Sequence, residues 1–205
     1  MSSSSFSEPK KVAFDHTAPH TVVIMGPPRS GTSMVSGILR LLGIYMGQCN
    51  TANNEDPRFN KKRGTDKIRT LIAANNAAYP VWGWKEPSTH TYYDDVADLV
   101  RTPYLIVVCR NILGSAASKL KHTGDGDMAR LLGSYANHYM KIGKLANQTD
   151  APCLYINYDK AVSDPVALAE YLSQRLLGKA LDDDMKDRIT RYCAPGEYKS
   201  IEDFL

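Results

Sequence analysis

The sequence has 205 residues, 43% of them hydrophobic and 23% charged, and its formal net charge is +3 at pH 7. This composition is typical of a globular domain rather than of a disordered or membrane protein, and the length suffices for one domain with a sizeable core. A net charge this small does not by itself indicate a nucleic-acid-binding protein.

Residues 1–18 are rich in Ser and Lys and lack hydrophobic periodicity, so we expect a flexible N-terminal leader followed by one domain over residues 19–205. The first residues contain no apolar stretch of signal-peptide length, and no run in the sequence approaches the length of a membrane span. The four cysteines form no CxxC pair and no zinc-ligand pattern. Together these features predict a cytoplasmic protein with reduced thiols and no metal site.

From residue 21 onward, short apolar runs alternate with segments of helical periodicity. The run 21–25 predicts a strand, and a helix follows its glycine-containing loop. The runs 104–109 and 153–157 predict strands covered on both faces, and 81–84 predicts a fourth strand. Helices are expected over 128–147 and, after a Ser-Asp-Pro start signal, over 166–177. This alternation predicts the α/β class, with a single P-loop-type, doubly wound domain whose central parallel sheet is flanked by helices.

The most specific signal is the loop after the first of these strands, Gly26-Pro-Pro-Arg-Ser-Gly-Thr-Ser33. Its glycines permit a backbone that turns successive N–H groups toward one point, and the following helix adds the positive end of its dipole, so the loop is suited to bind phosphate. The general P-loop pattern has a lysine where this chain has Thr32, and Arg29 supplies a cation earlier in the loop. The alternative is a strand-to-helix turn that binds no ligand.

At Pro28-Arg-Ser-Gly-Thr-Ser33 the chain resembles the sulfotransferase superfamily, whose loop has the pattern Pro-Lys/Arg-Ser-Gly-Thr-Thr/Ser. The resemblance implies a reaction that transfers the sulfuryl group of 3′-phosphoadenosine-5′-phosphosulfate to a hydroxyl, without a metal. It also implies that Arg29 stabilises charge on the sulfuryl group, a role that suits a fixed cation. The loop's amides and hydroxyls would hold the 5′-phosphate, which assigns to nucleotide binding Pro28, Arg29, Ser30, Gly31, Thr32 and Ser33.

Later stretches extend the resemblance. Arg110 and Ser118 match the family's arginine and the serine eight positions later that contact the 3′-phosphate. Eight residues span just over two helical turns, so an irregular start of the helix is needed to bring both side chains to one phosphate. The stretch 155–165 is similar to the family's last core strand and helix, whereas its glycine- and lysine-rich C-terminal nucleotide loop has no evident counterpart after Gly178.

The stretch Trp-Gly-Trp-Lys85-Glu-Pro is similar to the Trp-Gly-Lys-Asp-Pro stretch of bacterial and tyrosyl-protein members, which implies that Lys85 reaches the reacting sulfate. Sulfuryl transfer also needs a general base near the acceptor. Glu55, in a segment similar to the one that carries the glutamate of these members, is the first candidate. Glu86 is the second and His90 the third, and for each of the three a plain surface role is the alternative.

The segment between Arg58 and Arg69 carries the strongest local charge, with one acidic residue, Asp66, against six basic ones. A solvated helix face is one explanation. The other is that the segment attracts an anionic acceptor, such as an acidic glycan or a nucleic acid, because it lies where the family admits its acceptor. The basic residues are Arg58, Lys61, Lys62, Arg63, Lys67 and Arg69.

The leading hypothesis is therefore a sulfotransferase with an unidentified acceptor. The alternative is a P-loop kinase that uses ATP and Mg²⁺ to phosphorylate a hydroxyl, which includes a hydroxyl on a modified base in DNA. In that case Arg29 would replace the loop lysine, and Glu86 or Asp94 would hold the metal. A nucleotide-binding module without catalysis is the third hypothesis.

Overall fold

The computed structural model describes residues 5–9, 12–51, 53–124, 126–194 and 200–205. The strands are β1 (Phe6–Ser7), β2 (His20–Met25), β3 (Val81–Lys85), β4 (Pro103–Cys109) and β5 (Cys153–Asn157). The helices are α1 (Thr32–Leu41), α2 (Thr65–Ala78), α3 (Ile112–Thr123), α4 (Met128–Gln148), α5 (Tyr158–Ala161), α6 (Pro165–Leu177) and α7 (Asp183–Cys193). Among these described residues, no helix is both long and apolar enough to cross a membrane.

The described strands form one sheet in the order β1-β5-β4-β2-β3, and every neighbouring pair is parallel except β1 with β5. β2 is the first strand of the parallel set, and the chain later adds β3 on one side of it and β4 on the other. The carboxyl end of β2 is therefore a topological switch point, where open α/β sheets bind their ligands. The expected phosphate loop leaves the sheet at this point.

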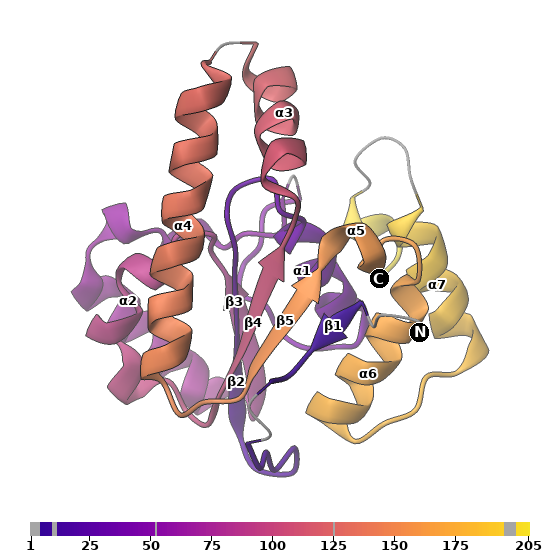
Figure 1. Cartoon of the computed structure of the whole chain (residues 1–205). Helices are drawn as coiled ribbons and strands as arrows, with labels where there is room; N and C mark the ends of the chain where they lie inside the picture. Colours follow the sequence, from indigo (N-terminus) through magenta and orange to yellow (C-terminus); the bar gives the residue numbers. More distant parts are fainter. Residues whose placement is uncertain (1–4, 10–11, 52, 125, 195–199) are drawn as a thin grey trace.

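Helices cover both faces of the sheet (Figure 1). Side chains of α1, α6 and α7 share one buried cluster with alternate residues of the strands, such as Val22 and Ile24 of β2. Side chains of α2 and α4 share a second cluster with the intervening residues, such as Val23 of β2 and Trp84 of β3. Successive residues of a strand point to opposite faces, which explains why the central strands are apolar throughout. The expected α/β fold class is confirmed.

The individual elements also agree with expectation. The strands predicted from the four apolar runs and the two predicted helices are all present, each to within one residue at either end. The start of α6 shows why its boundary could be predicted. Asp164 caps the helix by accepting a hydrogen bond from the N–H of Ala167, and Pro165 occupies the first helical position.

The described part of the expected flexible leader instead packs against the domain. Phe6–Ser7 pairs antiparallel with β5, and Glu8 forms an ion pair of 2.9 Å with Arg175 of α6. Residues 1–4 and 10–11 lie outside the described residues. A strand of two residues carries no periodicity, so its pairing with β5 could not be predicted from the pattern of this segment.

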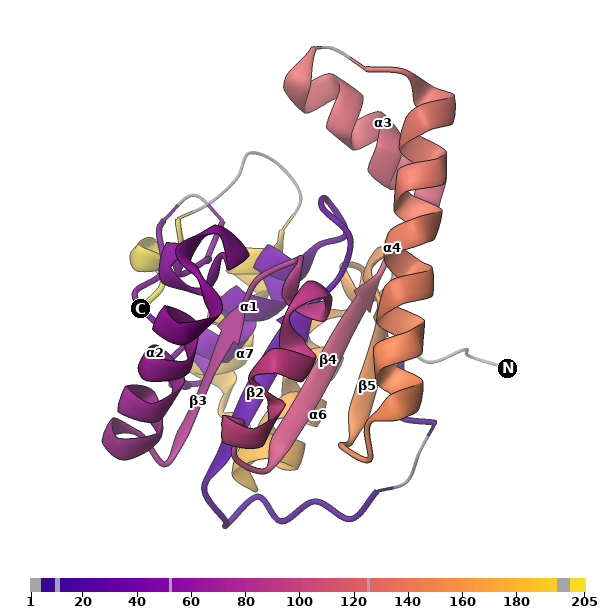
Figure 2. The same cartoon turned by 90° about the vertical axis from the view of Figure 1, so that its left-hand side faces the viewer.

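Helices α3 and α4 form a hairpin that extends past the carboxyl ends of the strands (Figures 1 and 2). Only Ser115 and Ala116 of α3 are buried, and the buried residues of α4 begin at Tyr135. The base of the hairpin is therefore part of the domain, whereas its outer half stands above the edge of the sheet where the phosphate loop lies.

Candidate functional site

A cavity of about 740 Å³ lies where the parallel strands end. Residues at the carboxyl end of each of these four strands, or just after it, contribute to its wall. The lining consists of Pro28, Arg29, Gly31, Thr32, Ser33 and Met34 after β2; Asn53 and Glu55; Lys85 and Pro87 from the end of β3; Arg110, Lys119 and His122 after β4; Tyr158, Asp159 and Val162 after β5; and Tyr192, Cys193 and Ala194.

The phosphate loop has the backbone that its glycines were expected to permit. Arg29 and Gly31 both adopt left-handed conformations, with φ of 65° and 96°. A Cβ atom on Gly31 would lie 1.9 Å from the ring of Tyr158, so any side chain at this position requires the ring to move. Helix α1 begins directly afterwards at Thr32. The N–H of Met34 donates to the carbonyl of Gly31 at 3.1 Å, whereas the N–H groups of Thr32 and Ser33 have no acceptor among the described residues. Thr32 and Ser33 both line the cavity, so this end of α1 is placed where it could bind a phosphate.

Ser30 differs from the other residues of the loop. Its side chain is fully buried, its N–H donates to the carbonyl of Pro27 at 3.2 Å, and its hydroxyl lies close to Gly26. Ser30 is not among the residues that line the cavity. The geometry gives Ser30 a place in the interior of the loop, whereas Thr32 and Ser33 face the cavity.

Arg110 connects the end of β4 to the phosphate loop and to α5. Its Nη1 donates to the carbonyl of Arg29 at 3.2 Å, and its Nε lies 3.4 Å from Oδ1 of Asp159. The guanidinium also lies 4.9 Å from the ring centroid of Tyr158, a cation–π geometry. Ser118 accepts a hydrogen bond of 3.4 Å from Nε of Arg29. Arg29 thus bridges Arg110 and Ser118, which the spacing along a helix could not bring together.

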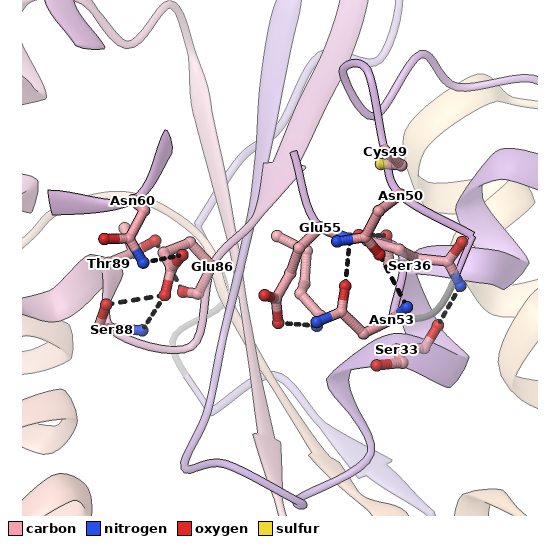
Figure 3. A network of polar contacts seen from close by, with 12 residues as sticks. Ser33, Ser36, Cys49, Asn50, Asn53, Glu55, Asn60, Glu86, Ser88 and Thr89 are labelled. Atoms are coloured by element: carbon pink, nitrogen blue, oxygen red, sulfur yellow. Dashed lines mark hydrogen bonds and ion pairs between the residues drawn. The ribbon is translucent and has the colours of Figure 1, made fainter. Parts of the chain in front are cut away.

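Lys85 and Glu55 form an ion pair inside the cavity, with 2.5 Å between Nζ and Oε1. The Lys85 side chain is only 2% exposed, compared with 23% for Glu55. Burial lowers the pKa of Lys85, and the carboxylate of Glu55 offsets part of this effect. Figure 3 shows Glu55 beside Asn53, whose side-chain oxygen accepts from the Glu55 N–H at 3.1 Å. Two of the residues expected to be catalytic therefore contact each other.

The position of Glu55 depends on its neighbour Asn54, which is fully buried in a left-handed conformation with φ of 56°. The side chain of Asn54 donates to the carbonyl of Ser33 and to the hydroxyl of Tyr192, each at 3.1 Å, and accepts from Arg40 at 2.7 Å. These bonds attach the segment to α1 and α7. The carboxylate of Glu55 is thereby held beside the phosphate loop.

Glu86 and His90 lie elsewhere. The Oε1 of Glu86 accepts from the N–H and the hydroxyl of Ser88, at 3.2 and 2.8 Å, in a set of contacts separate from that of Glu55 (Figure 3). The ring of His90 packs 5.2 Å from that of His138 of α4. Neither candidate lines the cavity. Consecutive residues at the end of a strand point in opposite directions, which separates Glu86 from Lys85.

The basic segment between Arg58 and Arg69 does not contribute to the cavity wall. Arg58 binds the buried carboxylate of Asp56 at 2.6 Å, and Arg69 binds Asp98 at 2.7 Å. Lys61 donates to a backbone carbonyl at 2.8 Å. Half of the six cations thus have partners within the protein, which reduces the charge that the segment can offer to an acceptor.

Several lining residues were not identified from the sequence as functional. Tyr158 and Asp159 belong to a stretch that was interpreted as architectural, yet they contact Gly31 and Arg110. Tyr192 comes from the part of the chain after Gly178, where no nucleotide-binding loop was evident. Lys119 could have been identified from the sequence, because it directly follows Ser118, which was already a candidate.

No family model and no curated protein matches the chain. Among solved structures, the sulfotransferase domain of the Synechococcus PCC 7002 olefin synthase is similar at 15% identity and a TM-score of 0.57, over 95% of this chain and 87% of that one. A sulfotransferase from Mycobacterium avium is similar at 12% identity and a TM-score of 0.57, over 88% and 70%.

Retinol dehydratase, solved with androsterone and the inactive cofactor PAP, is similar at 14% identity and a TM-score of 0.53, over 86% of this chain. This chain spans less than two thirds of that protein, 65% of its length. At such identities these likenesses concern the fold alone. They confirm the expected resemblance to the sulfotransferase superfamily at this level: the chain has the sulfotransferase fold.

Proposed function

We propose that this chain transfers a sulfuryl group from 3′-phosphoadenosine-5′-phosphosulfate to a hydroxyl of an acceptor. The observation that carries the proposal is the contact between Lys85 and Glu55 in the same cavity as the phosphate loop. A buried cation beside a carboxylate, next to a phosphate-binding loop, supplies both the charge stabilisation and the base that the reaction needs. Retinol dehydratase and mouse SULT7A1, which have similar folds, were each crystallised with PAP.

The residues present suit a nucleotide with several anionic groups. The cavity is lined by four cations, Arg29, Lys85, Arg110 and Lys119, and its lining carboxylates are Glu55 and Asp159. The left-handed loop and the amides of Thr32 and Ser33 at the start of α1 fit a 5′-phosphate, and the same two residues would donate from their hydroxyls. Arg110 and Ser118, joined through Arg29, would hold the 3′-phosphate. When bound, the nucleotide supplies an activated sulfuryl group.

Glu55 is the proposed general base. Its Oε1 binds Lys85, and within the described part of the chain its Oε2 has no hydrogen-bond partner, so that oxygen is free to accept the proton of an acceptor hydroxyl. Protonation would neutralise the carboxylate and leave the charge of Lys85 without its partner. The ammonium would then be available to stabilise negative charge near Arg29 at the moment when the acceptor oxygen attacks.

The kinase is the second candidate, but the cavity gives it less support. Both carboxylates of the wall are already paired, Glu55 with Lys85 at 2.5 Å and Asp159 with Arg110 at 3.4 Å. Glu86 accepts hydrogen bonds from Ser88 outside the cavity. A kinase of this architecture needs a carboxylate that is free to bind Mg²⁺ near the phosphates.

Thermal unfolding with added nucleotide tests the proposal. At a hundredfold excess over Kd, a ligand of the native state stabilises it by about 2.7 kcal/mol, which raises the Tm of a chain of this size by about 5 to 10 °C. We expect this rise with adenosine 3′,5′-bisphosphate (PAP), and expect Arg110→Ala to remove it. Arg69→Ala is the control, because Arg69 pairs with Asp98 outside the cavity. A larger rise with ATP and Mg²⁺ than with PAP would overturn the proposal in favour of a kinase.

A further inference from the structure

Two residues of α3, Lys119 and His122, line the cavity without a role in the transfer described above. With Ser115 and Ser118 they are spaced by three or four residues, so all four lie on one side of the helix. Ser118 contacts Arg29, which places this side of α3 beside the phosphate loop. His122 lies one helical turn further out, about 6 Å along the axis from Ser118. The cavity therefore continues from the loop along α3.

Lys119 gives this side of α3 a positive charge. Among the described residues, no carboxylate forms an ion pair with Lys119, which is half-buried. Neither α3 nor α4 contains an acidic residue. In the connection between them, Asp127 is the cap of α4 and accepts from the N–H of Ala129 at 2.9 Å, and Asp125 lies outside the described residues. A half-buried cation that lines a cavity and forms no ion pair with the described residues fits an anionic ligand.

The basic segment between Arg58 and Arg69 competes with α3 for this role. Three of its cations have partners within the protein, and none of its residues lines the cavity. Lys119 and His122 do line the cavity, on the hairpin that extends past the ends of the strands (Figure 2). An acceptor that reaches Glu55 would thus pass α3 without having to contact the basic segment.

We propose that Lys119 and His122 form an anion-binding subsite that recognises a phosphate, sulfate or carboxylate group of an acidic acceptor. The inference rests on the proposed function, because the phosphate loop, Arg110 and Ser118 are then occupied by the nucleotide. The same chemistry would suit the 3′-phosphate of the nucleotide itself. The next lysine of α3, Lys121, is not part of this subsite. It lies two residues after Lys119, about 200° around the helix, and does not line the cavity.

The test compares the wild type with the double variant Lys119→Ala/His122→Ala and with Lys121→Ala as the matched control. Alanine favours the helix at these positions, and circular dichroism checks that α3 and the fold persist. Calorimetry measures the affinity for PAP and for adenosine 5′-monophosphate, which lacks the 3′-phosphate. A nuclear magnetic resonance titration measures the affinity of the PAP-saturated protein for inorganic sulfate, as a probe for an acidic acceptor.

The expected result is an unchanged affinity for PAP and a loss of about tenfold or more in the affinity for sulfate, as follows from the removal of charge-assisted hydrogen bonds. A tenfold loss for PAP but not for adenosine 5′-monophosphate would assign the subsite to the 3′-phosphate. Unchanged affinities for all three ligands, or an equal loss in Lys121→Ala, would overturn the inference. If the wild type does not bind PAP, the proposed function fails. Sulfate titrations of the nucleotide-free wild type and variants then still test whether Lys119 and His122 bind an anion.

Discussion

Replacement of Gly31 by alanine tests how the phosphate loop is held. The residue has a φ of 96°, and a Cβ atom there would lie 1.9 Å from the nearest ring atom of Tyr158. Two costs follow. The left-handed conformation is unfavourable for any L-residue with a side chain, by about 1–2 kcal/mol. The ring of Tyr158 must also move away, because non-bonded carbon atoms do not approach each other so closely. The loop then loses its contact with this ring.

The size of the second cost follows from what Tyr158 touches. Its ring lies 4.9 Å from the guanidinium of Arg110, an interaction that contributes about 0.5–1 kcal/mol when it is partly exposed. The sum for Gly31→Ala is a loss of about 1.5–3 kcal/mol. Gly43 offers a matched control, because its φ is 84° and a Cβ atom there would meet nothing within 4 Å. Gly43→Ala should therefore cost only the backbone part, about 1–2 kcal/mol.

Urea denaturation of the two variants measures the difference, and a double-mutant cycle with Tyr158→Ala assigns it. Once the ring is removed by Tyr158→Ala, Gly31→Ala should cost no more than Gly43→Ala. The losses of stability from Gly31→Ala and Tyr158→Ala should therefore be less than additive. Equal costs for Gly31→Ala and Gly43→Ala in the presence of Tyr158 would refute the reasoning. The ring would then be free to move, and it would not hold the loop.

Three further predictions concern the cavity wall. Asp159→Asn should tighten the binding of PAP about two- to fivefold, because Arg110 loses an internal partner at 3.4 Å, and calorimetry at low salt measures this. The pKa of Lys85 is lowered by burial, so folding stability should rise with pH up to about 10.5, where an unfolded lysine also loses its proton. Lys85→Met should remove that rise in urea titrations at successive pH values. Ser30→Ala should leave the affinity for PAP unchanged and the stability equal or higher by up to about 1 kcal/mol, since the hydroxyl is buried without a partner among the described residues.

The parts of the fold that the sequence predicted are those whose signal is local. The strands at 104–109 and 153–157 are continuously apolar because both faces are covered, and the helix at 166–177 has a capping aspartate and a proline at its start. The pairing of Phe6–Ser7 with β5 has no such signal. It depends on the edge that β5 leaves open, which is a property of the assembled sheet.

The candidate site shows the same division. Arg29, Lys85 and Arg110 were predicted to act together, and they do line one cavity, because the carboxyl ends of parallel strands meet at one edge of the sheet. The choice between Glu55 and Glu86 could not be made from residue type alone. It depends on the direction of each side chain: Glu55 reaches Lys85 from another segment, whereas Glu86 points away from it.

The source of the cavity's cations bears on the difference between sulfuryl and phosphoryl transfer. In a P-loop kinase the lysine belongs to the loop itself and works with a metal that a carboxylate holds. Here Thr32 replaces that lysine, and the buried cation comes from the end of β3. Its partner is Glu55, the proposed base, at 2.5 Å. In the proposed reaction, proton transfer to Glu55 would therefore release the positive charge of Lys85, and the cation would act most strongly when the acceptor oxygen has lost its proton.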